Sequence, residues 1–303
     1  MKLDNNGLGP VAGTKIAKAL LASAKLGNAE GKRSKLHTVY CGRNRLQDEA
    51  QEGRLKALKE EHGSLEAKLE ELRLREPDGE EIKLIEKKLA SRPCADWWAE
   101  AFAAHGTLVD VRMPQNGIGM NGITGLALGL AKCHELRHLD LQDNAFTAVE
   151  GTAEDNASAV KAWAQALPSW PELRVLNIAS CVLSSEGEVP HIIQVLASGS
   201  NPKLHTLQLQ TNDLETETFA FLAKNISGHL SSIMLLELEE DGLEGGDELE
   251  AIRDGLKARG GKCRLFVDDE DVFEEEAADE ENVASTDKEA DSLADLLAKV
   301  QIK

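Results

Sequence analysis

One eleven-residue pattern recurs along this chain and limits the folds open to it more than any other feature. The pattern is LxxLxLxxNxL, where L stands for an apolar residue and N for asparagine, cysteine or aspartate. Its alternating apolar positions predict a short strand with one buried face. Six copies begin at Leu36, Leu108, Leu136, Leu173, Leu204 and Ile233.

The spacing of the copies predicts the rest of each unit. From Leu108 onward the first positions lie 28, 37, 31 and 29 residues apart, which leaves room for a helix after each strand. Stacked units of this kind form leucine-rich repeat proteins. We therefore predict an α/β leucine-rich repeat solenoid, a ribonuclease-inhibitor-like horseshoe with a parallel sheet on its concave side and helices outside. The helices are expected at residues 124–132, 157–167, 188–197, 217–226 and 247–258.

One spacing is too long, and it predicts an insertion. Leu36 and Leu108 lie 72 residues apart, and residues 48–92 carry apolar side chains at heptad spacing on both sides of the turn signal Pro77-Asp78-Gly79. This indicates an antiparallel coiled-coil hairpin between repeats at 1–47 and repeats at 93–267. An exposed spacer is the interpretation we favour for the hairpin, and a docking arm is the alternative.

The two ends of the chain differ from the repeats. Residues 268–303 hold 14 acidic and 3 basic side chains, and ten of the carboxylates fall within 268–281. Their repulsion predicts a disordered acidic tail, followed at 292–300 by a short amphipathic helix that orders on a partner. At the other end, Leu3, Asn6 and Leu8 match only the second half of the pattern. We therefore expect that the first repeat is truncated at Met1.

Composition excludes several classes of function. The net charge of -19 leaves no basic footprint for nucleic acid, and no apolar run has the length of a membrane span. The eight histidines form no HExxH motif and no paired spacing with the five cysteines, so we expect no metal site and reduced thiols. No constellation of residues indicates a hydrolytic site.

One nucleotide-binding motif is present but has a simpler interpretation. Gly117, Gly119 and Gly122 spell GxGxxG between a predicted strand and a predicted helix, as in dinucleotide sites. The same stretch is the strand-to-helix turn of one repeat. We favour the repeat turn.

A binding surface remains, and its candidates lie in the loops after the strands. The residue before each template asparagine should project from such a loop, because solenoids bind through these loops and the concave face. The series runs from neutral or basic to acidic, which directs attention to the N-terminal half. Its members are Asn5, Arg43, Gln115, Asp143, Ser180, Thr211 and Glu240.

Several phrases resemble the Ran GTPase-activating protein family, in the family's usual order. They are NNGLGPVAGTKIAKAL from Asn5, CGRNRL from Cys41, QNGI from Gln115 and LDLQDNAFT from Leu139, and the acidic tail fits as well. The resemblance covers residues 3–281 apart from the predicted hairpin, which departs from the family pattern.

The resemblance implies a GTPase activator that binds Ran-GTP, acts in nucleocytoplasmic transport and has no hydrolytic site of its own. It leaves room for a Ran-binding protein in the complex. Asn5 matches the asparagine that holds the catalytic glutamine of Ran, whereas Asn6 should be structural. Arg43 and Arg45 match the next repeat and are expected to contact acidic or phosphate groups of Ran. The resemblance implies no cofactor for this chain, because GTP and magnesium belong to Ran.

The same resemblance implies a monomer in the cytoplasm, with the cytoplasmic side of the nuclear envelope as a more specific location. As a fragment the chain should have reduced activity. The alternative function is a non-catalytic leucine-rich repeat scaffold for protein–protein interaction.

Overall fold

The strands of the chain form one parallel sheet in which each repeat contributes one strand. The computed structural model describes residues 1–46, 68, 93–147, 161–183, 188–239 and 246–266. Sheet order follows sequence order from β1 to β7, and every neighbouring pair is parallel. The strands are β1 (Thr38–Tyr40), β2 (Asp110–Arg112), β3 (His138–Asp140), β4 (Val175–Asn177), β5 (Thr206–Gln208), β6 (Leu235–Glu239) and β7 (Lys262–Phe266).

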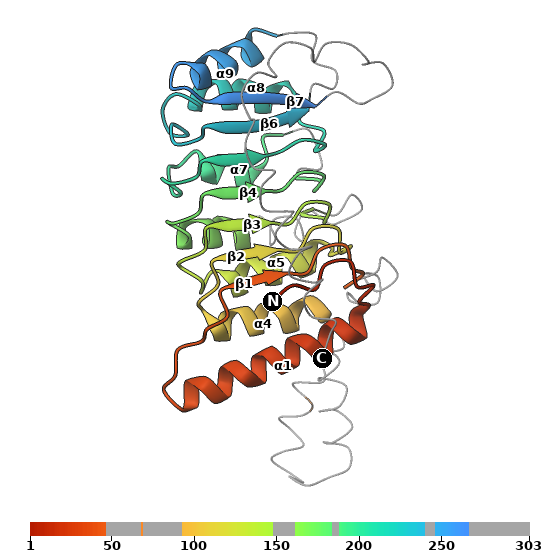
Figure 1. Ribbon diagram of the computed structural model, residues 1–303. Coiled ribbons are helices and arrows are strands. Elements are labelled where there is room, and N and C mark those ends of the chain that lie inside the picture. The colour runs from red at the N-terminus through yellow and green to blue at the C-terminus, as the bar shows by residue number, and fades with distance from the viewer. Residues whose placement is uncertain (47–67, 69–92, 148–160, 184–187, 240–245, 267–303) are drawn as a thin grey trace, which may run out of the picture. The chain divides into compact units, whose positions relative to one another are not determined.

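Helices return the chain behind this sheet, so that one face of the sheet is covered and the other is open (Figure 1). The first begins with Pro10 after Gly9, where a proline is favoured because its missing N–H would have no partner. The helices are α1 (Pro10–Ala29), α4 (Cys94–His105), α5 (Met120–Leu130), α7 (His191–Leu196), α8 (Thr216–Asn225) and α9 (Asp247–Lys257), with a 3-10 turn η1 (Leu167–Ser169).

The core lies between the sheet and the helices, and the pattern positions fill it. The pairing register places Val39 beside Val111 and Val111 beside Leu139, so that equivalent positions form rows across the sheet. Together with Leu176, Leu207 and Leu236, these residues are fully buried. Burying a leucine side chain contributes about 2 kcal/mol, and the rows make the repeats depend on their neighbours.

Two neighbouring helices, α4 and α5, pack unusually closely. A Cβ atom added to Gly129 of α5 would lie 2.3 Å from the backbone oxygen of Ala99 in α4. Only glycine allows that approach. Within α4, the rings of Trp98 and Phe102 lie 5.6 Å apart between their centroids and are fully buried.

The α/β leucine-rich repeat fold is therefore confirmed, whereas several element boundaries differ from the predicted ones. Helix α5 begins at Met120 rather than at residue 124. The glycines in this stretch are poor helix formers, so the sequence pattern did not indicate the start of the helix. Helix α7 begins at His191 rather than at residue 188, since Pro190 occupies the position before it. The sequence analysis did not predict β7, which carries the alternating pattern without a following asparagine.

Other predictions fall partly or wholly outside the described residues. The proposed hairpin at 48–92, except for Lys68, and the acidic tail at 268–303 belong to this group. Residues 1–267 form one compact unit. All five cysteines are free thiols. Among the described residues no helix is both long and apolar enough to cross a membrane.

Candidate functional site at the strand-end loops

The loops that follow the strands share one backbone conformation. In six of them the residue before the template position is left-handed, with φ between 52° and 57°. Left-handed backbone is rare outside glycine and costs most other residues about 1–2 kcal/mol. These residues are Asn5, Arg43, Gln115, Asp143, Ser180 and Thr211, the first six members of the series from the sequence.

Buried template asparagines hold these loops in place. Asn144 donates from Nδ2 to the carbonyls of Leu141 at 2.9 Å and Met113 at 3.0 Å, and its Oδ1 accepts from the backbone N–H of Ile118 at 3.0 Å. One amide therefore satisfies backbone groups of two repeats. Asn44 and Asn212 make equivalent bonds.

A thiol replaces the amide in one repeat. The Sγ atom of Cys181 donates to the carbonyl of Leu141 at 3.2 Å, and its backbone N–H donates to Oδ1 of Asn212 at 2.8 Å. Burial raises the pKa of Cys181 to about 12. Cys181 therefore takes the structural place of the template asparagine in this repeat.

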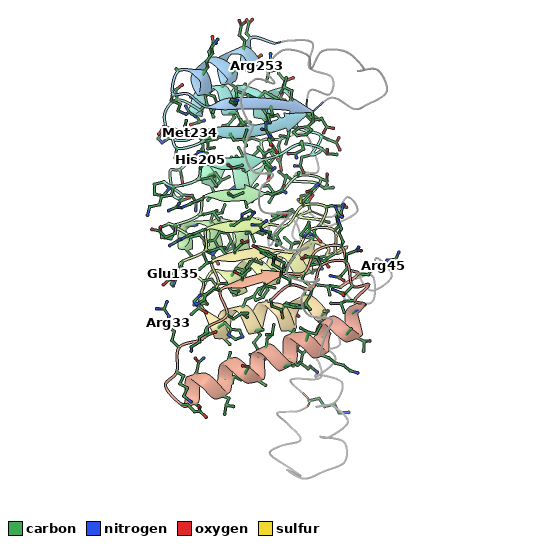
Figure 2. The ribbon with its side chains drawn as sticks, in the orientation of Figure 1. Arg33, Arg45, Glu135, His205, Met234 and Arg253 are labelled. Atoms are coloured by element: carbon green, nitrogen blue, oxygen red, sulfur yellow. The ribbon has the colours of Figure 1, made fainter. Side chains whose placement is uncertain are left out.

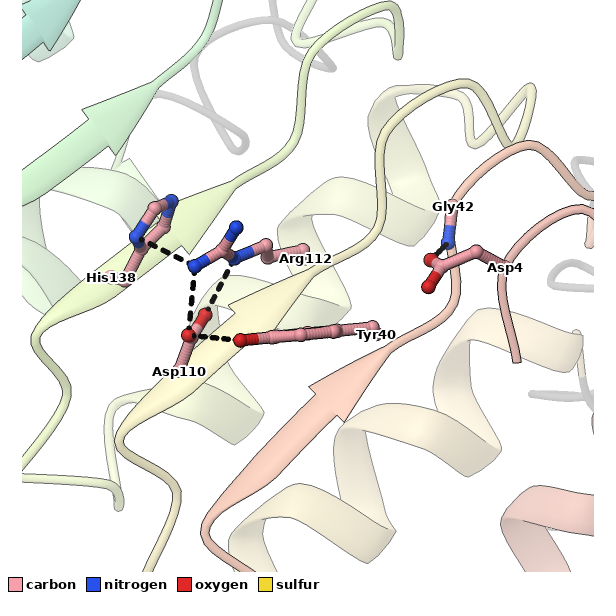
Figure 3. A network of polar contacts seen from close by, with 6 residues as sticks. All are labelled: Asp4, Tyr40, Gly42, Asp110, Arg112 and His138. Carbon is pink, nitrogen blue, oxygen red and sulfur yellow. Dashed lines mark hydrogen bonds and ion pairs between the residues drawn. The ribbon is translucent and has the colours of Figure 1, made fainter. Parts of the chain in front are cut away.

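The loop that carries Asn5 is tied to the loop of the next repeat. The N–H of Asn5 donates to the carbonyl of Gly42 at 2.9 Å, and the N–H of Gly42 donates to Oδ1 of Asp4 at 2.7 Å (Figure 3). The side chain of Asn5 remains exposed. Asparagine tolerates left-handed backbone better than most residues, so the position suits it structurally as well as chemically.

Asn6, the template asparagine of this first loop, differs from its counterparts. Its side chain is exposed, and its Nδ2 donates to the carbonyl of Asp4 at 3.0 Å. Its backbone N–H donates to Oδ1 of Asn44 at 3.2 Å. The side chain of Asn6 therefore bonds only within its own loop, unlike the buried template asparagines.

The second loop is fixed by a glycine and presents two arginines. A Cβ atom on Gly42 would lie 2.8 Å from Cγ of Pro114, so only glycine fits there. Arg43 and Arg45 are exposed on either side of buried Asn44. Neither guanidinium has a hydrogen-bond or ion-pair partner within the described part of the chain. The structure therefore brings Asn5 and Arg43 to neighbouring loops with both side chains free to meet a partner.

Beside these loops, the open face of the sheet carries a polar network (Figure 3). The hydroxyl of Tyr40 donates to Asp110 at 2.7 Å, and Arg112 donates to both oxygens of Asp110 at 3.0 Å. The Arg112 guanidinium also lies 4.6 Å from the centre of the Tyr40 ring and 3.4 Å from Nδ1 of His138. Four side chains from three strands are thereby fixed in one arrangement.

The network changes how its members ionise. Burial alone would raise the pKa of Asp110, but the hydrogen bonds from Arg112 and Tyr40 and the neighbouring positive charge lower it below its ordinary value. Burial lowers the pKa of His138, and the charge of Arg112 lowers it further. At neutral pH the network thus holds a carboxylate, a guanidinium and a neutral imidazole.

Sequence reasoning missed this network and the role of Asp4. The signal was present in the residues that flank the central apolar position of each copy, because those side chains point to the open face of the sheet. They are Tyr40, Asp110, Arg112 and His138, and only the loop positions were considered as candidates.

The repeat turn accounts for the first two glycines of the GxGxxG motif. Gly117 has a φ of 61°, as does Gly7 at the same place in the first loop. Gly119 precedes α5 as Gly9 precedes α1, with nearly the same extended backbone. Both residues therefore occupy ordinary positions of the shared repeat turn.

Fold and loops together define a leucine-rich repeat protein with a rigid row of side chains along one edge of its sheet. Ran GTPase-activating protein 1 of Saccharomyces cerevisiae is 31% identical to the chain over 257 residues, which cover 83% of this chain and 50% of the yeast protein. That similarity relates the chain to the Ran GTPase-activating protein family. The chain spans about half the length of this relative. No family model matches the chain.

Proposed function

We propose that this chain activates GTP hydrolysis by Ran, with Asn5 at the catalytic contact. The similarity to the yeast Ran GTPase-activating protein 1 carries the proposal. The exposed side chain of Asn5, on a loop held to the next loop by two hydrogen bonds, supports it. GTP and magnesium belong to Ran in this scheme, and this chain supplies no hydrolytic group.

The role of Asn5 is to position another residue. An amide both donates and accepts hydrogen bonds without carrying charge, so it can hold the amide of Ran's glutamine in the orientation that places the attacking water. Phosphoryl transfer depends mainly on placement and electrostatics. A loop with a fixed backbone suits this role, because ordering the asparagine then costs little conformational entropy.

Arg43 and Arg45 are the proposed partner contacts. Both are exposed beside the Asn5 loop, and a guanidinium pairs well with carboxylate or phosphate groups. Arg43 lies in the loop next to Asn5, whose N–H bonds to Gly42. We expect these arginines to strengthen binding of Ran-GTP rather than to speed the chemical step. We propose that the chain acts as a monomer in the cytoplasm and that a Ran-binding protein can join the complex.

Single-turnover GTP hydrolysis by Ran tests the proposal. The chain should accelerate the reaction, and Asn5→Gly should remove most of the acceleration. Glycine is the sharper substitution than alanine, because it adopts the left-handed backbone of Asn5 without strain. Asn5→Asp is the matched variant, since aspartate tolerates the same backbone but lacks the amide donors; Asp143 already occupies that place in another loop.

The outcomes separate the two candidate classes. Acceleration that Asn5→Gly leaves unchanged would overturn the role of Asn5. Binding of Ran-GTP without acceleration would favour a non-catalytic scaffold, and no effect on either binding or hydrolysis would overturn the proposal. Arg43→Glu should weaken binding of Ran-GTP while leaving the maximal rate largely intact.

A further inference from the structure

A cavity of about 720 Å³ lies between α1, α4 and the segment that leads into β1. This segment precedes the strand, whereas Arg43 and Arg45 follow it. Figure 2 accordingly shows Arg33 and Arg45 at opposite edges of the sheet. The cavity is therefore separate from the loops assigned to Ran.

Basic side chains dominate the rim of this cavity. Lys32, Arg33 and Lys35 line it, and no carboxylate does. In a chain with a net charge of -19, three cations within four residues are a local reversal of charge. Such a rim attracts anions.

Existing ion pairs at the rim leave the cations available. Arg33 lies 2.7 Å from a carboxylate oxygen of Glu135, and Lys32 lies 2.7 Å from one of Glu30. All four side chains are about half exposed or more, and exposed pairs of this kind contribute only about 0–1 kcal/mol. The ammonium of Lys35 has no hydrogen-bond or ion-pair partner among the residues that the structure describes.

Hydrogen bonds hold the segment that carries these cations to α4 and to the residues that follow α4. Ser34 Oγ accepts from the N–H of Leu36 at 3.1 Å and shares a hydrogen bond of 2.6 Å with Nδ1 of His105. Thr107 donates to the carbonyl of Leu36 at 2.9 Å. Because these bonds fix the segment, its backbone needs little ordering when a ligand arrives.

Apolar side chains form the floor. Leu20 and Ala24 of α1 and Leu36 line the cavity below the cations. The volume falls within the range of about 300–1,000 Å³ that is typical of small-molecule sites. The site can therefore take a ligand with a compact dianionic group and an apolar body.

We propose that this cavity binds a phosphate monoester. A monoester dianion matches a cluster of three cations better than a single carboxylate does, and a guanidinium such as that of Arg33 can bind two phosphate oxygens at once. The organic part of the ligand packs on the apolar floor. The ligand is either a free phosphorylated molecule or a phosphorylated side chain of a protein, and both present the same chemistry to the rim.

Isothermal titration of the full chain with two probes tests the proposal. Phenyl phosphate represents a free monoester, and a phosphotyrosine peptide represents a modified protein, with the unphosphorylated peptide as its control. We expect saturable binding of at least one phosphorylated probe. The double variant Arg33→Glu/Lys35→Glu should weaken it at least tenfold.

A matched variant separates a site from general attraction. Arg174→Glu/Lys203→Glu changes the net charge equally, at exposed residues before β4 and β5. It should leave binding within about twofold of the unaltered chain. No saturable binding of either probe, or equal weakening by both double variants, would overturn the proposal. Tighter binding of phenyl phosphate than of the phosphopeptide indicates a free ligand as the source, and tighter binding of the phosphopeptide indicates a protein. Ran is absent from the assay, so the result does not depend on the function proposed above.

Discussion

The carboxylate of Asp4 accepts a 2.7 Å hydrogen bond from the backbone N–H of Gly42. This contact joins the loop that presents Asn5 to the loop that presents Arg43. Gly42 in turn accepts the N–H of Asn5, so the two loops are linked in both directions. Asp4 is therefore linked to Asn5 through the backbone of Gly42.

Asp4→Ala should loosen the Asn5 loop and lower Ran activation. Loss of one partly buried hydrogen bond is worth about 1 kcal/mol, or about fivefold in rate if the effect is felt at the transition state. Asp4→Asn is the control, because its amide oxygen can still accept the N–H of Gly42. Equal activity of both variants and the unaltered chain would show that Asp4 has no positioning role.

Asn144→Ala should lower the free energy of unfolding by roughly 3 kcal/mol, because it leaves buried carbonyls and one buried N–H without partners. Urea denaturation measures this. The neighbouring change Asp143→Asn is the control: it affects an exposed left-handed residue and should be nearly neutral. A loss below about 1 kcal/mol for Asn144→Ala would contradict the assigned role.

Gly129→Ala should destabilise the protein by about 1–3 kcal/mol, although alanine favours helices. Its Cβ would lie 2.3 Å from a backbone oxygen in α4, so the helices must separate. Gly125→Ala on the same helix is the matched comparison. There the Cβ meets only a side-chain oxygen of Asp96 at 3.2 Å, and the change should be neutral or stabilising in thermal melts. If both substitutions behave alike, the close packing of the helices is not the cause.

Alkaline pH should destabilise the fold through its buried thiols. Burial raises the pKa of Cys41 and Cys181 to about 12 from the ordinary 9.0. A raised folded pKa gives stability that is present below pH 9 and is lost as the pH rises from 9 toward 12, since unfolded thiols ionise first. Cys181→Ser should make melting temperature fall less steeply across this range. An unchanged slope would count against the contribution of this thiol.

Arg112→Gln should raise the pKa of Asp110. Burial raises this pKa, and the hydrogen bonds from Arg112 that lower it would be weakened. A carboxyl group whose pKa is lowered in the folded state stabilises the fold above about pH 4. This stabilisation is lost as the pH falls through the folded pKa. The variant should therefore be less stable than the unaltered chain at pH 7, with a smaller difference at pH 3. Carbon NMR of the Asp110 carboxyl measures the pKa directly. Arg174→Gln, an exposed arginine elsewhere on the repeat, should leave it unmoved.

The sequence predicted six of the seven strands that the structure describes, because their apolar positions recur in a local pattern. Leu139 and Asn144, for example, occupy fixed places in an eleven-residue unit. The shared left-handed backbone was not predicted, because Arg43, Gln115 and Thr211 have no special preference for it. Only the neighbouring repeats impose that conformation.

The polar network was beyond prediction for a different reason. Tyr40 and Asp110 are 70 residues apart, and their contact depends on the register between β1 and β2. A repeat pattern implies that such rows exist, but it does not say which side chains in a row will pair. Asn5 was identified through family resemblance, and its exposed place in the first loop agrees with that expectation without testing its role.

The row of left-handed residues also sets a scale for recognition. Parallel strands lie about 4.8 Å apart, so the six loop residues from Asn5 to Thr211 mark out about 24 Å along one edge. A globular partner can span that distance and touch every step at once. Because the backbone of each loop is hydrogen-bonded to the next loop, the side chain at a loop position can be exchanged while the spacing between loops stays constant. Substitutions at single loop positions can therefore change the affinity for a partner without changing the distances between the positions.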